Sequence, residues 1–266
     1  MLSLAHLTFM HAGPLELIAL AKAGGFDAVG IRLVDPAPQA AFFPLVHDAK
    51  LRRQVKAELA ATGIALMDVE AIWLWPETKA PALRPALEAG AELGARNVLI
   101  AGNDPDRQRM TERLIELCGM AREYEMGVGF EFIPYTALNS LAYSHEILKA
   151  AAQPNAGLLI DALHLNRSGG SPADIAAIDP ALIAYGHLCD APAASPGPEE
   201  IRSEARSARL YPGDGGLPLK AFLQALPEGK PIAMEAPSTA YGGDDMEKAR
   251  RAGAACRKLL AEASRG

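Results

Sequence analysis

Short apolar runs alternate with amphipathic segments along the whole chain. The apolar runs predict strands, because a strand covered by protein on both faces carries apolar residues without alternation. The amphipathic segments place apolar residues three or four positions apart, as in Leu51, Val55 and Leu59, which is typical of a helix with one buried face. The pattern therefore predicts a regular alternation of strand and helix.

Eight such strand–helix pairs can be counted. The strands are expected around residues 3–9, 28–34, 64–70, 97–101, 128–133, 157–161, 182–187 and 231–235. The helices are expected near residues 14–24, 48–62, 80–93, 105–125, 139–151, 172–178, 218–226 and 245–263. Eight pairs in 266 residues favour a single (β/α)₈ TIM barrel, one domain over residues 1–266, because this fold takes about 250 residues.

A doubly wound open sheet is the alternative fold. That fold usually carries a Gly-rich phosphate loop after its first strand, and residues 8–14 contain no such loop. Glycines also follow three of the predicted helices, at Gly63, Gly94 and Gly127, and supply the left-handed turn that ends a helix. Their spacing of about 30 residues matches one strand, one helix and two short loops. The Ala191–Gly197 stretch is expected to be a long loop after strand seven.

Four consecutive predicted strands each end in an acid or a histidine: Glu131, Asp161, His187 and Glu235. In a barrel the carboxyl ends of the strands meet at one rim, where the chemistry of such folds takes place. Carboxylates are costly to bury without a partner, so a cluster of them predicts a cation that compensates their charge. Three carboxylates and one imidazole suit one divalent metal ion, Mn²⁺, Mg²⁺, Co²⁺ or Zn²⁺. Buried ion pairs are the alternative interpretation.

The order Glu, Asp-x-x-His, His, Glu on strands five to eight resembles the xylose-isomerase-like superfamily of sugar phosphate isomerases and epimerases. The resemblance covers essentially the whole chain. It implies that Glu131, Asp161, His187 and Glu235 hold one divalent metal ion. It also implies that Glu131 and Glu235 form the acid/base pair on opposite faces of the substrate.

Three further residues match positions of this family. His164, the histidine of Asp-x-x-His, would form a hydrogen bond with a substrate oxygen. Arg209 begins Arg-Leu-Tyr-Pro-Gly-Asp-Gly, similar to a family loop whose arginine contacts substrate hydroxyls or a carboxylate. Asp190 would orient this loop or His187, without a direct catalytic role.

The expected activity is isomerisation or epimerisation of a small sugar or hydroxy-carbonyl compound by proton transfer through an enediolate, a reaction of carbohydrate metabolism. A metal-dependent dehydratase acting on a cyclic keto-polyol or keto acid is the second interpretation. A non-catalytic ligand-binding barrel is the third. The apurinic endonuclease branch is disfavoured, because Ala208-Arg209-Leu210 replaces its Asp-Arg-His triplet and no histidine ends strand four.

The first half of the chain departs from the family pattern. Arg32 stands near the end of strand two, where many members have an acid. An arginine there could bind a substrate carboxylate or phosphate, but we favour an ion pair with Asp35 or Glu70. The remaining candidates for the substrate pocket are His6, Glu70, Trp73 and Trp75.

Charge and hydropathy limit the partners. The net charge of −6 argues against a nucleic-acid groove, which is normally basic. No apolar run reaches the roughly 18 residues of a membrane helix. The first residues lack the features of a signal peptide, so the chain is expected to be cytoplasmic and to act on a small molecule. Surface helices in this family often form dimers or tetramers, so a homo-oligomer is expected.

Overall fold

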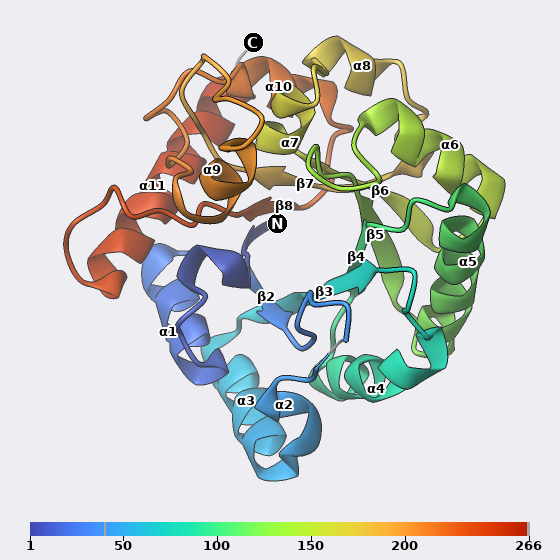
Figure 1. Ribbon diagram of the computed structural model, residues 1–266. Coiled ribbons are helices and arrows are strands. Elements are labelled where there is room, and N and C mark those ends of the chain that lie inside the picture. The colour runs from blue at the N-terminus through green and yellow to red at the C-terminus, as the bar shows by residue number, and fades with distance from the viewer. Residues whose placement is uncertain (40, 265–266) are drawn as a thin grey trace.

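A computed structural model describes residues 1–39 and 41–264 of the chain. Its eight strands are parallel and form a closed barrel in sequence order, with β8 paired to β1 (Figure 1). The strands are β1 (Leu2–Leu4), β2 (Ala28–Arg32), β3 (Ala65–Leu74), β4 (Asn97–Gly102), β5 (Gly127–Glu131), β6 (Ala156–Asp161), β7 (Ile183–Leu188) and β8 (Ile232–Met234). This is the single (β/α)₈ TIM barrel predicted from the sequence.

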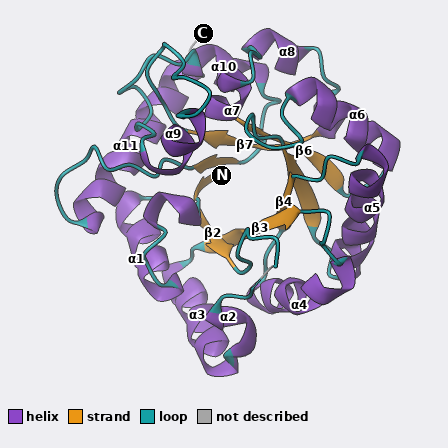
Figure 2. Ribbon diagram, viewed as in Figure 1, coloured by secondary structure: helices purple, strands orange, loops and turns teal. Residues whose placement is uncertain are grey.

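Helices form an outer ring around the strands (Figure 2). They are α1 (Pro14–Gly24), α2 (Pro44–His47), α3 (Ala49–Thr62), α4 (Arg84–Leu93), α5 (Arg107–Glu123), α6 (Leu141–Ala151), α7 (Ala162–Arg167), α8 (Pro172–Ala176), α9 (Ile201–Ser207), α10 (Leu219–Ala225) and α11 (Asp245–Ala263). The larger hydrophobic core lies between this ring and the barrel, where outward residues such as Val69 and Ile160 meet helix residues such as Leu87.

A second, smaller core fills the inside of the barrel. Its members come from seven strands or strand ends: Ala5, Ala28, Met67, Ala71, Leu99, Leu159, Tyr185 and Ala233. Half of them are alanines, and Tyr185 is the largest member. A Cβ added at Gly129 would lie 2.6 Å from the ring of Tyr185, so the glycine on β5 makes room for the tyrosine on β7. The barrel interior is therefore packed below its carboxyl-terminal mouth.

The main differences from the predicted elements lie near the loops. β1 ends at Leu4, because residues 6–9 turn into a 3-10 helix. β3 continues to Leu74, with a register shift against β4. The short helices α2, α7 and α9 lie in loops after strands, where strand–helix alternation alone predicts no element. The segment 191–197 contains no helix or strand, as expected of a long loop.

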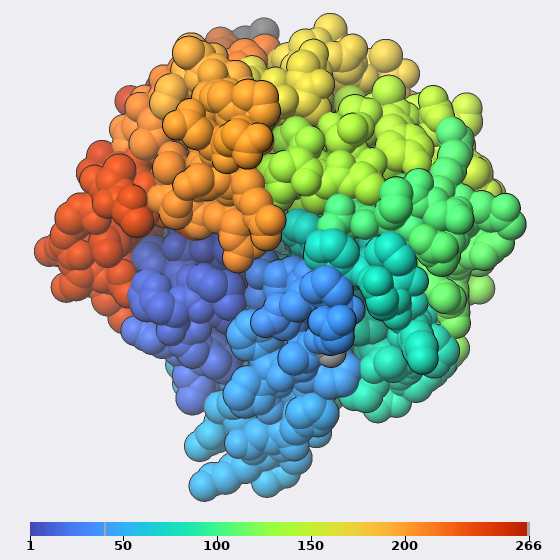
Figure 3. Space-filling view, viewed as in Figure 1, coloured from blue at the N-terminus to red at the C-terminus, as the bar shows by residue number. Residues whose placement is uncertain are grey.

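The loops after the strands cover much of the barrel centre on the face shown in the space-filling view (Figure 3). Two of them contribute to the same cavity: Pro36, after β2, and Arg206, in α9 after β7, both line it. No helix in the described part of the chain is long and apolar enough to cross a membrane.

Candidate metal centre

The four strand-end residues predicted as ligands come together in the structure. One ligand atom each from Glu131, Asp161, His187 and Glu235 lies within 4.8 Å of the other three, and all four residues are buried. Glu131 and Asp161 are the last residues of β5 and β6, His187 is the penultimate residue of β7, and Glu235 directly follows β8. Four adjacent strands thus deliver their ligands to one point.

The two-residue period of a strand explains this convergence. Leu159, Tyr185 and Ala233 belong to the core inside the barrel. Asp161, His187 and Glu235 each come two positions later on the same strand, so they face the same interior one layer higher. Glu131 likewise comes two positions after Gly129 on β5. Gly129 has no side chain, and the ring of Tyr185 occupies the space beside it.

The donor set fits a divalent ion. Both ring nitrogens of His187 and one carboxylate oxygen of Glu131 are buried without a hydrogen-bond partner. Such atoms are costly to bury unless something binds them. The cluster holds three carboxylates, and Arg209 is the buried cation that pairs with two of them. A divalent ion would balance the remaining charge.

The pKa shifts indicate the same demand for a cation. Burial disfavours the charged form of His187, but attraction to Glu235 and Glu131 outweighs it and raises the pKa of this imidazole to about 10. Burial raises the pKa of Glu131 well above its usual value. For Glu235, attraction to His187 and Arg209 exceeds the effect of burial and lowers the pKa of the carboxyl. Without a metal ion, His187 keeps a proton whose positive charge faces the carboxylates of the cluster.

Arg209 is buried to 1% exposure and holds the cluster from one side. Its guanidinium donates hydrogen bonds to the Asp161 carboxylate at 2.7 Å and to the Glu235 backbone carbonyl at 3.0 Å. It also lies 3.1 Å from the Glu235 carboxylate, and its Nε donates to the Ala205 carbonyl. This arginine therefore fixes two metal-site acids; the substrate contact expected from the sequence stays a prediction.

His164 lies beside the cluster, at 2% exposure. Its Nε2 is 3.4 Å from a guanidinium nitrogen of Arg209, and its Nδ1 has no hydrogen-bond partner. Burial lowers the pKa of the ring to about 4, so the imidazole is neutral near pH 7. A neutral ring with an unused nitrogen can form a hydrogen bond with a substrate oxygen, and this role of His164 stays a prediction.

A narrow cavity of about 30 Å³ at the mouth of the barrel lies between the metal cluster and the opposite wall. We call it the mouth cavity; its wall includes Glu131, Glu235, His164, Arg209, Arg206, Arg32, Trp73 and Tyr135. Trp73 was predicted here, whereas Tyr135 and Arg206 were not, because loop side chains carry no periodicity. Trp75 stacks on Trp73 at 5.9 Å between ring centroids, and its indole donates to the Pro36 carbonyl.

Asp190 anchors the loop that carries Arg209. Its carboxylate accepts hydrogen bonds from the backbone N–H groups of Ala191, Gly213, Gly215 and Leu217, at 2.9 to 3.0 Å. A Cβ at Gly215 would collide with this carboxylate, so the glycine is required by the close approach. The sequence-based expectation that Asp190 orients this loop agrees with these contacts.

Two candidates from the first half of the chain are tied to the protein itself. The ring of His6 accepts from the Arg32 backbone N–H and pairs with the Ala12 carbonyl at 3.0 Å, so both nitrogens are used. Glu70 is fully buried and accepts from the His6 backbone N–H. Neither lines the mouth cavity.

A buried acid pair below the mouth was not predicted. Asp68 and Glu70 both approach Gly30, where an added Cβ would collide with their carboxylates. Tyr185 donates a 2.7 Å hydrogen bond to Asp68 across the barrel interior. Burial raises the pKa of Asp68 to about 6 and that of Glu70 to about 8. Asp68 and Glu70 are two positions apart on β3 and share a face, but their contact with Tyr185 could not have been found from the sequence, since it depends on β3 and β7 facing each other.

The ion pair favoured for Arg32 does not form. In the described part of the chain, no carboxylate oxygen lies within 4.0 Å of its guanidinium nitrogens. Asp35 instead accepts a hydrogen bond from the Ala37 backbone, and Glu70 faces the barrel interior. Arg32 is nevertheless 93% buried, with 7% exposed, and it lines the mouth cavity.

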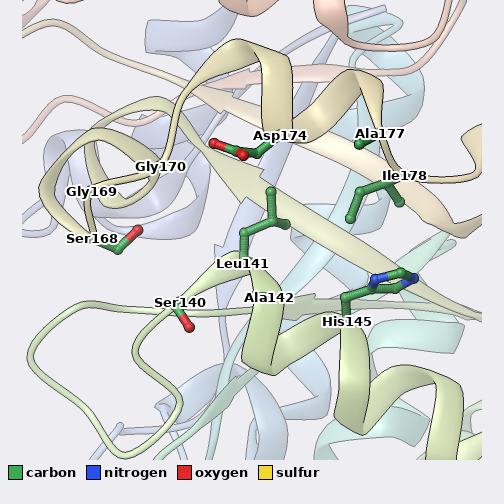
Figure 4. A pocket seen from close by; sticks show the side chains of 10 residues that line it. All are labelled: Ser140, Leu141, Ala142, His145, Ser168, Gly169, Gly170, Asp174, Ala177 and Ile178. Carbon is green, nitrogen blue, oxygen red and sulfur yellow. The ribbon is translucent and has the colours of Figure 1, made fainter.

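Another pocket lies outside the barrel, between the start of α6 and the segment that joins α7 to α8 (Figure 4). His145 and Asp174 are its titratable side chains, and Asp174 is engaged in capping α8 with Ser171. No member of the metal cluster lines this pocket. The chemistry is therefore concentrated at the barrel mouth.

Comparison with known proteins gives curated relatives that include an isomerase and a dehydratase. The chain is 27% identical over 126 residues to an inosose isomerase of Bacillus velezensis, which covers 46% of this chain and 42% of that protein. It is 25% identical over 234 residues to a 3-dehydroshikimate dehydratase of Pseudomonas aeruginosa, which covers 83% of this chain and 35% of that protein. The chain thus spans less than half the length of either relative.

Among solved structures, the IOLI protein with a bound zinc atom superposes with a TM-score of 0.75 and 20% identity. The superposition covers 98% of this chain and 97% of that one, and it shows the shared fold. The xylose isomerase-like TIM barrel family matches residues 18–259 of the sequence. By its fold and by this match, the chain belongs to the xylose isomerase-like TIM barrel family.

Proposed function

We propose that this chain is a divalent-metal-dependent enzyme that isomerises or epimerises a small hydroxy-carbonyl compound. The observation that carries the proposal is the convergence of Glu131 and Glu235 on one buried cluster that opens into the mouth cavity. The two glutamates come from β5 and β8, with Asp161 and His187 between them on β6 and β7. A ligand in the mouth would therefore have a carboxylate on each side.

Glu131, Asp161, His187 and Glu235 would hold the metal ion. Bound there, the ion would act as a Lewis acid toward adjacent carbonyl and hydroxyl oxygens of a substrate and stabilise negative charge on them. Arg209 keeps Asp161 and Glu235 in place through direct hydrogen bonds. His164 offers its unused ring nitrogen to a substrate oxygen.

The two glutamates would move the proton. One carboxylate takes the proton from the carbon next to the carbonyl, which leaves an enediolate. If a proton returns to the neighbouring carbon, the product is an isomer. If the other glutamate returns a proton to the first carbon from the opposite face, the product is an epimer. Both outcomes use the same residues.

Dehydration is the second candidate, favoured by the similarity to a 3-dehydroshikimate dehydratase over 83% of this chain. Here one glutamate would take the same proton, and the other would give a proton to a hydroxyl group on the next carbon. That hydroxyl leaves as water and a carbon–carbon double bond remains. The first step is shared with isomerisation, so the fate of the hydroxyl distinguishes the two.

The test incubates Mn²⁺-loaded protein in D₂O with ketoses, hydroxypyruvate and cyclic keto-polyols. The protein and the Mn²⁺ are then removed, and proton NMR spectra of the compounds are recorded. Exchange of an α-proton together with a new isomer or epimer is expected. An enone without an isomer would assign the dehydratase. Glu131→Gln and Glu235→Gln should each abolish exchange while the fold is kept, and Glu228→Gln, an exposed site, is the matched control.

Two results would contradict the proposal. If both glutamine variants kept near-full turnover, the two-glutamate mechanism would be wrong. If the protein bound no divalent ion by equilibrium dialysis, or exchanged no proton while it bound ketoses, it would be a ligand-binding barrel.

A further inference from the structure

Arg32 differs from the other buried arginines of the described chain. Arg167 forms a two-fold ion pair with Glu204, with both nitrogen–oxygen distances at 2.8 Å, and Arg209 pairs with Asp161 and Glu235. Arg32 is buried to a similar degree, yet its Nε has no hydrogen-bond partner and no carboxylate lies within 4.0 Å. A buried guanidinium without a partner is costly unless a ligand provides one.

The position of Arg32 places it opposite the metal cluster. In the closed barrel β2 lies across from β6 (Figure 1). The mouth cavity is lined by Arg32 as well as by Glu131 and Glu235. Ala28 belongs to the core inside the barrel, and a Cβ at Gly30 would enter that interior. Side chains two positions apart on a strand share a face, so Arg32 also faces inward.

The charges around Arg32 leave its positive charge uncompensated. Glu70, the acid on the neighbouring strand, has its pKa raised to about 8 by burial and by the nearby Asp68, so it is largely neutral at pH 7. Within the metal cluster, a divalent ion and Arg209 would balance the three carboxylates. Arg206, exposed at the rim, adds a second positive charge to the cavity wall. Arg32 and Arg206 therefore both contribute positive charge to the cavity wall.

We propose that the substrate carries an oxyanion, a carboxylate or a phosphate, which binds to the Arg32 guanidinium while its hydroxy-carbonyl end lies at the metal cluster. This inference rests on the proposed function for the reacting end and deepens it by naming the substrate class. The planar guanidinium can donate two parallel hydrogen bonds to such a group. The aromatic side chains of Trp73 and Tyr135 line the cavity between the two ends.

The experiment compares matched compounds that differ only at one end. The first set is dihydroxyacetone, hydroxypyruvate and dihydroxyacetone phosphate; the second is fructose, fructuronate and fructose 6-phosphate. Dissociation constants are measured by calorimetry on Mn²⁺-loaded wild type, Arg32→Met, Arg32→Lys and Arg53→Met, the last being an exposed arginine that serves as control. Proton exchange in D₂O is measured in parallel.

The expected result is that an anionic member of one set binds at least tenfold more tightly than its neutral counterpart. Arg32→Met should remove this advantage, Arg32→Lys should keep part of it, and Arg53→Met should keep all of it. The compound that shows this Arg32-dependent advantage, the carboxylate or the phosphate, identifies the oxyanion that the site binds. Thermal unfolding of each variant verifies that the fold is retained.

The inference is overturned if no anionic compound binds more tightly than the neutral one, or if the advantage survives in Arg32→Met. The outcome for the proposed function is separate. Arg32-dependent binding without any proton exchange would keep the oxyanion site and reject the reaction. Proton exchange with an anionic compound whose binding and exchange Arg32→Met leaves unchanged would keep the reaction and reject the site.

Discussion

Arg209 donates a 2.7 Å hydrogen bond to the carboxylate of Asp161, and both side chains are almost completely buried. The arginine comes from the loop after β7, whereas the aspartate ends β6. The contact therefore links a loop to the metal cluster. It also gives the three clustered acids one permanent positive neighbour.

Replacing Arg209 with methionine should destabilise the fold. The substitution leaves Asp161 and Glu235 buried without their cation, and breaking a buried pair in this way costs about 3–5 kcal/mol. The free energy of unfolding from urea denaturation measures the effect. Arg250→Met, at an exposed position, should change stability by less than about 0.5 kcal/mol. Equal stability of the two variants would contradict the structural role of Arg209.

Metal binding should release protons. In the metal-free protein the pKa of His187 is raised to about 10, so this imidazole holds a proton at pH 7, and burial also raises the pKa of Glu131. A metal ion requires a neutral imidazole and ionised carboxylates. Calorimetric titration with Mn²⁺ in buffers of different ionisation enthalpy should report the release of at least one proton. Binding without any proton release would show that these atoms are not the ligands.

Asp161→Ala should weaken metal binding by roughly 100-fold, because it removes a ligand of the metal ion. Loss of a residue that only supports a ligand already weakens metal affinity by about 10–100-fold. Equilibrium dialysis with Mn²⁺ gives the affinity, and Glu228→Gln provides the control. Wild-type affinity in Asp161→Ala would place the ion elsewhere.

Asp190→Asn should loosen the loop that follows it without unfolding the barrel. The carboxylate accepts from four backbone N–H groups, and an amide offers only one acceptor oxygen. Each buried donor left unsatisfied costs about 1–3 kcal/mol. Hydrogen exchange of Gly213 to Leu217 should accelerate, whereas exchange in α5 should stay unchanged and serve as the internal reference. Unchanged protection in the loop would refute the anchoring role.

Glu70 should make the protein less stable as the pH rises. The folded state raises the pKa of this carboxyl from 4.5 to about 8, so the folded protein binds more protons than the unfolded chain between these values. The contribution of Glu70 to the free energy of unfolding is then fully present below about pH 4.5. It falls as the pH rises toward 8, by up to about 1.4 kcal/mol per pH unit. Urea denaturation across this range should show a weaker decline in Glu70→Gln. An equal decline in both proteins would contradict the shift.

The metal cluster could be predicted from the sequence because it follows from two local rules. Strand ends were visible as the ends of apolar runs, and residues such as Glu131 and Asp161 came directly at those ends. In a parallel barrel all such ends lie on one face. The position of the ligands therefore required no knowledge of distances.

The partners of Arg32 and Asp68 could not be predicted in this way. The ion pair favoured for Arg32 was chosen by proximity in sequence and on the next strand, but Asp35 and Glu70 are both held elsewhere. The Tyr185–Asp68 hydrogen bond joins residues from β7 and β3, and no pattern along the chain reports a contact across the barrel.

The packing of Tyr185 against Gly129 has a consequence for access to the metal cluster. The ring and its neighbours fill the barrel below the cluster, so the cluster opens toward the mouth. If the proposed reaction takes place there, its product leaves by the path on which the next substrate arrives. The loop that Asp190 anchors would then influence the rate of product release without contacting the transferred proton.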